Sequence, residues 1–289
     1  MAIDLTNKPI AITGAGSGIG RATALACAGA GMPVALSGRR EEPLRAVAAE
    51  IERAGGRAVV VPGDVTSPTD CARLIERCVE RFGSVYSVFA NAGYGQEAPA
   101  HEMTDDDIRA MFETNFFGTL NTIRPAVPHM LRARAGHILV CSSCVAKFAL
   151  PFFSVYSATK AAQNHLSRGM NLELRPHGVS VSSVHPVGTR TEFFDTAMRR
   201  SASGRLIKHT PDAFFQSPER VARAIVRCLR RPRPEVWTSL SVRLGMSLGM
   251  LLPGLSDRAL RRMVDQRLRE GEGAGPTAHA PPHPEGASA

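Results

Sequence analysis

The sequence lacks the features of a membrane-spanning or secreted chain. It has no uncharged apolar run of about 18 residues, the length that a transmembrane helix needs. Residues 1–8 contain no apolar signal core ahead of the first expected strand. With 44% hydrophobic and 21% charged residues among 289, the composition is that of a globular protein with a sizeable core. We therefore expect a cytoplasmic protein.

The sequence also lacks a disulfide framework. Its six cysteines are scattered, and this pattern is typical of a reducing compartment. Cys141 and Cys144 form a CxxC, but neither a second CxxC nor a His-x-x-His accompanies them. We therefore predict neither a metal site nor a redox role for this pair.

Carboxylates are scarce in one part of the chain. Residues 1–189 carry 18 Lys and Arg against 16 Asp and Glu, whereas residues 190–270 carry 17 against 8. The net charge of +9 therefore belongs to the C-terminal part. A basic surface can attract phosphates, acidic lipid or nucleic acid, but most often it is a solvated face. No nucleic-acid reading motif accompanies it, so we expect no nucleic-acid partner.

The first motif is a glycine-rich turn, TGAGSGIG, at residues 13–20. The apolar run 9–13 before it predicts a buried strand, and a helix-like run follows from Arg21. This order offers a helix N-terminus to a phosphate. Because position 19 is Ile, the spacing is GxxxGxG and not the common GxGxxG. We predict dinucleotide binding, in preference to a generic turn, by Gly14, Ser17, Gly18, Ile19 and Gly20.

The second expected strand, 33–37, ends without a carboxylate. A dinucleotide fold that prefers NAD places an acidic residue there for the ribose hydroxyls. This chain has Arg39 and Arg40 instead. Because a guanidinium donates paired hydrogen bonds to phosphate, we predict NADP(H) over NAD(H), with Arg39 on the 2′-phosphate and Arg40 as a helper or stacking partner. The alternative is two solvated loop arginines.

Strand-like and helix-like segments alternate through the rest of the chain. Strands are expected at 58–61, 85–90, 137–141, 179–184 and 234–238, and helices at 42–54, 71–82, 105–132 and 217–229. This alternation predicts an α/β, single-domain Rossmann fold, with a doubly wound seven-stranded parallel sheet and helices on both faces. Ligands bind beyond the carboxyl ends of such strands. Asp64, at one such end, would accept from the adenine amino group or cap the next helix.

Tyr156 and Lys160 stand four residues apart. A run without proline follows at 161–174, so we expect a helix that places both side chains on one face. A nearby ammonium favours phenolate, and the pKa of Tyr156 is therefore expected to fall below its ordinary value. Such a phenol is a usable general acid or base. Taken alone, this spacing also arises by chance.

In their order along the chain, these motifs resemble the short-chain dehydrogenase/reductase family of the single-domain, classical type. The resemblance covers about residues 5–237 and rests on the glycine turn, NAG at 91–93, Asn115, Ser143 with YSATK at 156–160, and PVGTRT at 186–191. It implies an enzyme that transfers hydride reversibly between NADPH and a carbonyl or secondary alcohol. The alternative is a non-catalytic NADP(H)-binding regulatory protein on the same fold, which would not need the intact catalytic set.

The resemblance also implies roles for individual residues. Tyr156 would be the general acid/base, Ser143 would hydrogen-bond the substrate oxygen, and Lys160 would bind the nicotinamide ribose while lowering the pKa of Tyr156. Asn115 would hold a proton-relay water near Lys160, and Asn91 would stabilise the central strands near the cofactor. Further cofactor-binding residues would be Asp64, Val65, Asn91, Ala92, Gly93, Tyr156, Lys160, Pro186, Val187, Gly188, Thr189 and Thr191.

One position departs from the family pattern. The turn after the sixth strand usually reads Pro-Gly, and this chain has Pro186-Val187. Valine carries a Cβ and is poorly suited to positive φ. Either the turn avoids that conformation or the nicotinamide pocket is reshaped.

Seven of the twelve phenylalanines lie between 148 and 215, namely Phe148, Phe152, Phe153, Phe193, Phe194, Phe214 and Phe215. The resemblance places these stretches beside the substrate, and apolar pockets favour apolar ligands. We therefore predict a small lipophilic carbonyl or alcohol as substrate. The alternative is ordinary packing in the core or in a dimer interface. A homo-oligomer is expected.

Beyond residue 238 the family pattern ends. Residues 240–255 are apolar but too short and interrupted to span a bilayer, and 256–270 show an amphipathic pattern with five arginines. Residues 240–270 would make a peripheral membrane contact or pack on protein, including another subunit. We divide the chain into a dinucleotide-binding and catalytic domain at 1–238, an extension at 239–270, and a tail at 271–289 whose composition predicts disorder.

Overall fold

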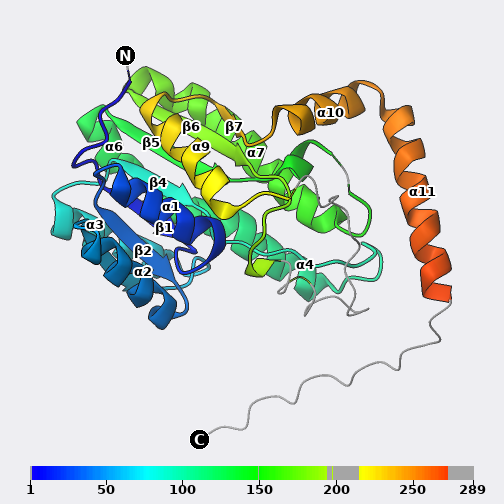
Figure 1. Cartoon of the computed structure of the whole chain (residues 1–289), viewed down its shortest axis with the longest axis horizontal. Coiled ribbons are helices and arrows are strands. Elements are labelled where there is room, and N and C mark those ends of the chain that lie inside the picture. The colour runs from blue at the N-terminus through cyan, green and yellow to red at the C-terminus, as the bar shows by residue number, and fades with distance from the viewer. Residues whose placement is uncertain (1, 149, 194–196, 198–214, 273–289) are drawn as a thin grey trace, which may run out of the picture.

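A seven-stranded parallel sheet forms the centre of the computed structural model, which describes residues 2–148, 150–193, 197 and 215–272 (Figure 1). The strand order is β3-β2-β1-β4-β5-β6-β7. The strands are β1 (Ile10–Thr13), β2 (Val34–Gly38), β3 (Ala58–Pro62), β4 (Ser87–Ala90), β5 (Gly136–Cys141), β6 (Val179–His185) and β7 (Glu235–Trp237). The predicted doubly wound α/β fold is confirmed.

Helices cover both faces of this sheet (Figure 1). On one face lie α1 (Gly18–Gly29), α2 (Glu41–Arg53) and α9 (Pro218–Arg230). On the other lie α3 (Pro68–Phe82), α5 (Gly118–Ile123), α6 (Val127–Ala133) and α7 (Ser154–Leu174). Because successive strand residues point to opposite faces, Ile10 and Ile12 join the first layer while Ala11 joins the second. Strands β1, β2, β4, β5 and β6 are therefore mostly buried, as parallel sheets require, whereas the edge strand β3 is mostly half-buried.

Hydroxyl caps define where several helices begin. The Ser67 side chain accepts from the amide of Asp70 at the start of α3, and the predicted cap Ser217 accepts from the amide of Arg220 at the start of α9. In both helices proline follows the cap directly, where its missing amide costs nothing. The N-cap of α3 is therefore Ser67 and not Asp64.

The segment predicted as one helix at 105–132 is divided into several pieces. It begins as α4 (Asp105–Phe112), continues as a π-helix, η1 (Glu113–Phe117), and then as α5 and α6. Asn115 lies inside the π-helix and is fully buried. A single π-turn within an α-helix frequently marks a functional site, because it re-aims the side chains that it carries.

Two further helices follow the sheet. The apolar stretch after β7 forms α10 (Leu240–Leu251), and the predicted amphipathic segment lies within α11 (Pro253–Glu272). Among the described helices, none combines the length and the apolarity that a bilayer crossing requires. The predicted disordered tail lies outside the described residues, apart from Gly271 and Glu272, which end α11. The proposed boundary at residue 238 remains a prediction.

Candidate active site

The glycine turn joins β1 to α1 in a conformation that needs glycine. Gly14 and Gly18 have φ values of +63° and +52°. A Cβ at Gly20 would overlap the carbonyl oxygen of Gly14, and a Cβ at Gly14 would lie 3.0 Å from the Asn91 amide nitrogen. The turn therefore packs closely on itself and on Asn91, while Gly14, Gly16, Ser17 and Gly18 line the cavity at the positive end of α1.

Asn91 connects this turn to the end of β4. Its Nδ2 donates to the carbonyl of Thr13 at 3.0 Å and to that of Gly14 at 3.3 Å. The Thr13 hydroxyl in turn accepts from the amides of Asn91 and Ala92, at 3.1 Å and 3.3 Å. Asn91 therefore holds β1, β4 and the glycine turn together, which agrees with its predicted stabilising role.

The two arginines after β2 have different surroundings. Both are exposed, and both line the same cavity as the glycine turn. Arg40 forms an ion pair with Glu192, with 2.6 Å between Nη2 and Oε2, across a sequence separation of 152 residues. Arg39 makes no ion pair within the described part of the chain. Arg39 is therefore the more available guanidinium.

Asp64 and Val65 line the cavity beyond β3. One Asp64 oxygen accepts from both the amide and the hydroxyl of Thr66 at 2.9 Å, which stabilises the turn before α3. The carbonyl of Val65 accepts from Asn121 at 3.0 Å. Asp64 thus stabilises a turn, and its predicted contact with adenine remains a prediction.

Tyr156 and Lys160 occupy the first turns of α7, as their spacing predicts. The Lys160 ammonium lies 5.5 Å from the centroid of the Tyr156 ring and donates to the Cys141 carbonyl at 2.8 Å. The Ser142 hydroxyl donates to the Lys160 carbonyl at 2.8 Å. The end of β5 therefore anchors the start of α7, and with it the tyrosine–lysine pair.

The expected lowering of the Tyr156 pKa is wrong for this structure. Burial raises the pKa of Tyr156, the thiols of Cys141 and Cys144 act in the same direction, and a hydrogen bond with Ser143 opposes them only in part. Burial also lowers the pKa of Lys160. The cost of desolvating the phenolate is the largest influence on the pKa of Tyr156.

Ser143 lies at the start of a short 3-10 helix, η2 (Cys144–Lys147), where its hydroxyl accepts from the Val145 amide at 3.3 Å. Its carbonyl is 2.9 Å from Nδ1 of His185, whose other nitrogen is 2.9 Å from the Ser183 hydroxyl. The His185 ring stacks on Trp237 with 4.5 Å between centroids. Sequence reasoning missed His185, which holds the Ser143 backbone from β6.

Asn115 does not line the cavity but lies buried behind it. Its side chain bonds the backbone of Tyr94 twice, at 2.9 Å and 3.0 Å, and the Thr159 hydroxyl at 3.0 Å. Its carbonyl accepts from Gln163 at 2.6 Å. These contacts join η1 to α7 and to the segment after β4. The predicted relay water remains a prediction.

The turn after β6 resolves the question posed by Val187. Among the described non-glycine residues, positive φ occurs only at Asn7, Arg134 and Phe152. The turn therefore avoids the conformation that valine would resist, and Val187 is buried. Its carbonyl accepts from the Thr189 hydroxyl at 2.7 Å.

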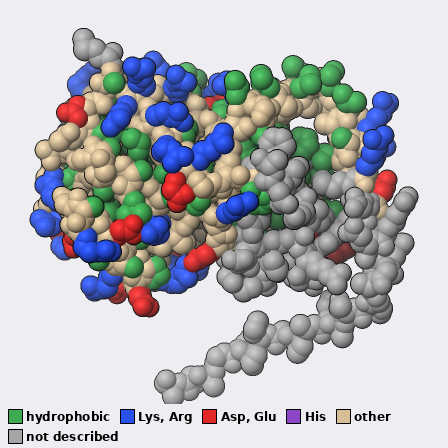
Figure 2. All heavy atoms as spheres, viewed as in Figure 1, with side chains coloured by type: hydrophobic (Ala, Val, Ile, Leu, Met, Phe, Trp, Pro, Cys, Tyr) green, Lys and Arg blue, Asp and Glu red, His purple; other side chains and the backbone are tan. Residues whose placement is uncertain are grey.

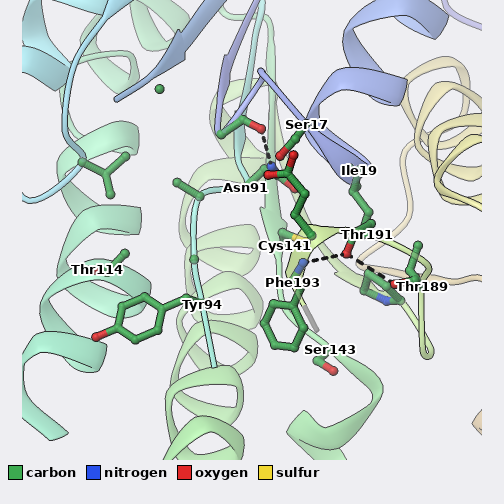
Figure 3. Close-up of a pocket in the computed structure, with 18 of the residues that line it drawn as sticks. Ser17, Ile19, Asn91, Tyr94, Thr114, Cys141, Ser143, Thr189, Thr191 and Phe193 are labelled. Carbon is green, nitrogen blue, oxygen red and sulfur yellow. Dashed lines mark hydrogen bonds between the residues drawn. The ribbon is translucent and has the colours of Figure 1, made fainter. Parts of the chain in front are cut away.

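These elements enclose one cavity of about 1050 Å³. All predicted site residues line it except Gly20, which lies under the glycine turn, and Asn115. In Figure 3, Ser17 and Ile19 lie at the upper right, and Thr189 and Thr191, from the turn after β6, lie below them. Ser143 lies below the ring of Phe193. Lining residues that the sequence did not single out include Tyr94, Thr114 and Glu192.

Aromatic side chains surround the tyrosine end of the cavity. Phe193 lies 5.4 Å and Phe153 lies 6.1 Å from the Tyr156 ring, centroid to centroid. Both line the cavity, together with Leu150 and Val145. Phe194 and Phe214 lie outside the described residues. The tyrosine end is therefore apolar, whereas glycines and arginines line the other end.

The residues present fit a dinucleotide. Gly14, Gly16 and Gly18 line the cavity without side chains, the N-terminus of α1 faces it, and the cavity continues from there to Tyr156. The cysteines of the CxxC pair are both free and buried, at the floor of the same cavity.

Comparison with known proteins agrees with this arrangement. The sequence pattern of the short chain dehydrogenases matches residues 8–202. An A-factor type gamma-butyrolactone 1'-reductase of Streptomyces virginiae is 34% identical over 76% of this chain and 87% of its own. A Burkholderia phymatum short-chain dehydrogenase/reductase in complex with NAD superposes with a TM-score of 0.78, at 25% identity, over 88% of this chain and 96% of that one.

A Thermococcus sibiricus alcohol dehydrogenase complexed with 5-hydroxy-NADP superposes with a TM-score of 0.68, at 28% identity, over 80% of this chain and 95% of that one. Similar chains thus bind either form of the nicotinamide cofactor, and a nicotinamide dinucleotide is the cofactor class that this cavity fits. On its sequence, its sheet topology and its site geometry, the chain belongs to the short-chain dehydrogenase/reductase family of oxidoreductases.

Proposed function

We propose that the protein is an NADP(H)-dependent oxidoreductase that interconverts a carbonyl and a secondary alcohol, with Tyr156 as general acid/base. The observation that carries the proposal is the convergence of Tyr156, Ser143 and Lys160 at one end of a cavity that begins at the glycine turn. The nicotinamide cofactor supplies the hydride when bound. The chain's own residues orient the substrate oxygen and move the proton.

The site supplies a proton donor together with groups that would hold the substrate oxygen and the cofactor. Because burial raises the pKa of Tyr156, the phenol stays protonated at neutral pH and is able to donate its proton to a carbonyl oxygen. The hydroxyl of Ser143 lines the same end of the cavity and would hydrogen-bond that oxygen. Lys160, held at the Cys141 carbonyl, would bind the ribose of the cofactor.

The preference for NADP(H) is supported by the two guanidiniums at the end of β2 and by the absence of a carboxylate in the Ser37–Arg40 stretch. Arg39 would take the 2′-phosphate, because Arg40 is already paired with Glu192. The Glu192 carboxylate that pairs with Arg40 comes from the segment after β6 and not from the end of β2, where an NAD-preferring fold places its ribose-binding carboxylate.

The lipophilic substrate class is supported by the apolar groups around Tyr156. Phe153, Phe193, Leu150 and Val145 line that end of the cavity. An apolar lining with a few placed polar groups selects an apolar ligand and orients its reacting oxygen. The predicted homo-oligomer, the cytoplasmic location and the peripheral membrane contact through 240–270 remain predictions of this proposal.

Replacing Tyr156 with Phe tests the catalytic role. We expect NADPH binding to persist and turnover to fall at least roughly 100-fold, because proton transfer is lost while the cavity keeps its shape. Binding is measured by the change in NADPH fluorescence and turnover by NADPH oxidation. The matched control is Tyr86→Phe, since Tyr86 lies outside the cavity. Near-wild-type turnover in Tyr156→Phe would refute the proposal.

A panel of carbonyl compounds tests the substrate class. We expect bulky aromatic, acyl-chain and steroid-like ketones to give higher kcat/KM than small polar ketones, because only the former fill the apolar end of the cavity. Each compound is assayed with NADPH and with NADH. A preference for small polar ketones would contradict the lipophilic class and leave the role of Tyr156 untouched.

A further inference from the structure

Helix α10 leaves its apolar side chains on the surface. Of the ten large hydrophobic side chains that are exposed in the described part of the chain, seven lie between residues 240 and 255. Five of them, spaced three or four residues apart, form what we call the leucine row: Leu240 (67% exposed), Leu244 (62%), Leu248 (54%), Leu251 (77%) and Leu255 (60%). That spacing places Leu240, Leu244, Leu248 and Leu251 on one side of α10, and Leu255 follows them at the start of α11.

The opposite side of α10 is already occupied. Val242, Met246 and Gly249 are half-buried, and the position of a Cβ at Gly249 lies 3.9 Å from the ring of Phe148. This side rests on the protein next to η2. Helix α10 is thus apolar on both sides, a pattern typical of a helix that is covered all round. Within the described residues, the contacts of α10 with the rest of the chain lie on one side only.

The charges around the leucine row are positive. Residues 240–256 contain no carboxylate, and residues 240–262 carry four arginines, Arg243, Arg258, Arg261 and Arg262, against one acidic residue, Asp257. All four arginines are exposed. In Figure 2 the hydrophobic side chains form a ridge over α10, and basic side chains border it where α11 begins. An apolar row beside exposed arginines complements an anionic lipid surface.

We propose that the leucine row inserts into the interface of an anionic membrane, with the arginines at the start of α11 on the lipid headgroups. The alternative occupant is a second copy of the chain. Pairing two leucine rows would bring two sets of arginines together with few carboxylates to offset them, and like charges in contact are unfavourable. An anionic bilayer offers both an apolar layer and the opposite charge. The contact does not depend on the proposed reaction.

Vesicle co-sedimentation of the full chain tests the proposal. The probes are phosphatidylcholine vesicles and phosphatidylcholine vesicles that also contain phosphatidylglycerol. We expect binding to the anionic vesicles that weakens as salt is added, and little binding to the neutral vesicles. Equal binding to both kinds of vesicle, or binding to neither, would overturn the proposal.

Variants locate the contact. Leu244→Ser, Leu248→Ser and Leu251→Ser together should weaken binding by roughly ten-fold for each leucine replaced, because each removes a buried apolar side chain from the interface. The control Leu172→Ser alters a leucine on α7 that is 76% exposed, and should change nothing. Equal binding by the triple variant and the wild type would overturn the proposal.

The arginines are tested separately. Arg258→Gln, Arg261→Gln and Arg262→Gln together should lower affinity for anionic vesicles by about five-fold for each charge removed. The control with Arg53, Arg132 and Arg175 changed to Gln removes the same charge from exposed sites elsewhere. Sedimentation velocity tests the alternative occupant, a second copy of the chain. If the wild type formed a dimer that the triple leucine variant dissociates, and bound no vesicles, the leucine row would be a dimer contact and the proposal would be overturned.

Discussion

The two halves of the sheet are stabilised in different ways. Around β1, β2, β3, α1 and α2 the buried polar side chains are three hydroxyls, those of Thr13, Thr23 and Ser37. Around β5, β6 and α7 they form an extensive set: His137, Ser157, Thr159, Lys160, Gln163, Asn164, Ser167, Asn171, Ser182, Ser183 and His185. The first half offers a ligand its backbone amides and two exposed arginines, whereas the second half offers buried side chains that must be held in orientation.

The difference shows how the fold divides its tasks. Apolar packing is non-directional and involves no titratable group, so it suits the half of the sheet that offers its backbone amides to a ligand. Buried hydrogen bonds are directional, so they suit a half that must orient Tyr156, Ser143 and Lys160. His137 and His185 make the second half sensitive to acid between pH 6.5 and 4, because burial lowers the pKa of each to about 4.

Acid should therefore destabilise the second half of the sheet, which orients Tyr156, Ser143 and Lys160, before it destabilises the first half. Between pH 6.5 and 4 the unfolded chain binds a proton at each of these histidines and the native chain does not, so the free energy of unfolding falls as pH falls. The loss should approach about 3 kcal/mol for each histidine and should vanish above pH 6.5. Urea unfolding at several pH values measures it.

Substitutions at the two histidines test whether they cause this pH dependence of the free energy of unfolding. His185→Gln and His137→Gln should each remove part of the pH dependence, since glutamine does not titrate. The control is His101→Gln, because His101 is exposed and contributes nothing by burial. If both variants kept the wild-type pH dependence of the free energy of unfolding, the two halves would not differ in acid sensitivity as proposed.

A cavity created in the first half of the sheet should lower the free energy of unfolding by a similar amount at every pH. Ile12 is fully buried in β1, in the layer that β1 shares with α1 and α9. Ile12→Ala should lower the free energy of unfolding by about 3 kcal/mol, through lost burial and the cavity left behind. Measured at pH 7 and at pH 5, the loss should be the same. A loss that grew in acid would contradict the assignment of pH sensitivity to the other half.

Replacing Arg39 should change the affinity for NADPH without changing the free energy of unfolding. It is exposed, so Arg39→Gln should leave urea unfolding unchanged. It should weaken NADPH binding by roughly 10-fold and leave NADH binding unaltered, because a charge-assisted bond to the 2′-phosphate is lost. Equal losses for NADPH and NADH would refute its role in cofactor choice.

Arg40 provides the matched comparison, with the smallest expected effect. Because it is paired with Glu192, Arg40→Gln should weaken NADPH binding less than Arg39→Gln does. Glu192→Gln should strengthen it a few-fold by releasing Arg40 for the phosphate. Titration of each variant with NADPH at constant ionic strength measures both effects.

The parallel sheet was predictable because its first four strands are short apolar runs followed by glycine, Asp or Asn, and helix-like segments alternate with strand-like segments. The glycine turn, the tyrosine–lysine pair and the turn after β6 were predictable for the same reason: local spacing determines local geometry. The sequence does not show the contact between Arg40 and Glu192, which joins residues from distant loops. Nor does it show His185 behind Ser143, because a buried histidine in an apolar strand gives no periodic signal.

Two other features depended on surroundings that a sequence pattern does not contain. The direction of the shift in the Tyr156 pKa depends on how deeply the phenol is desolvated, and the spacing of Tyr156 and Lys160 does not show that depth. Helix α10 was not expected because glycines interrupt it and its apolar residues have no single face. The π-helix at Asn115 likewise follows from packing against α7 and not from spacing.

The position of α10 against η2 has a kinetic consequence. The same short helix begins beside Ser143, so a bilayer that holds the leucine row would lie close to the apolar end of the cavity. A lipophilic substrate would then reach the enzyme from the lipid phase. Its effective concentration would be its mole fraction in the bilayer, and a KM expressed per volume of water would rise with each addition of inert lipid, whereas the same KM expressed per lipid would stay constant.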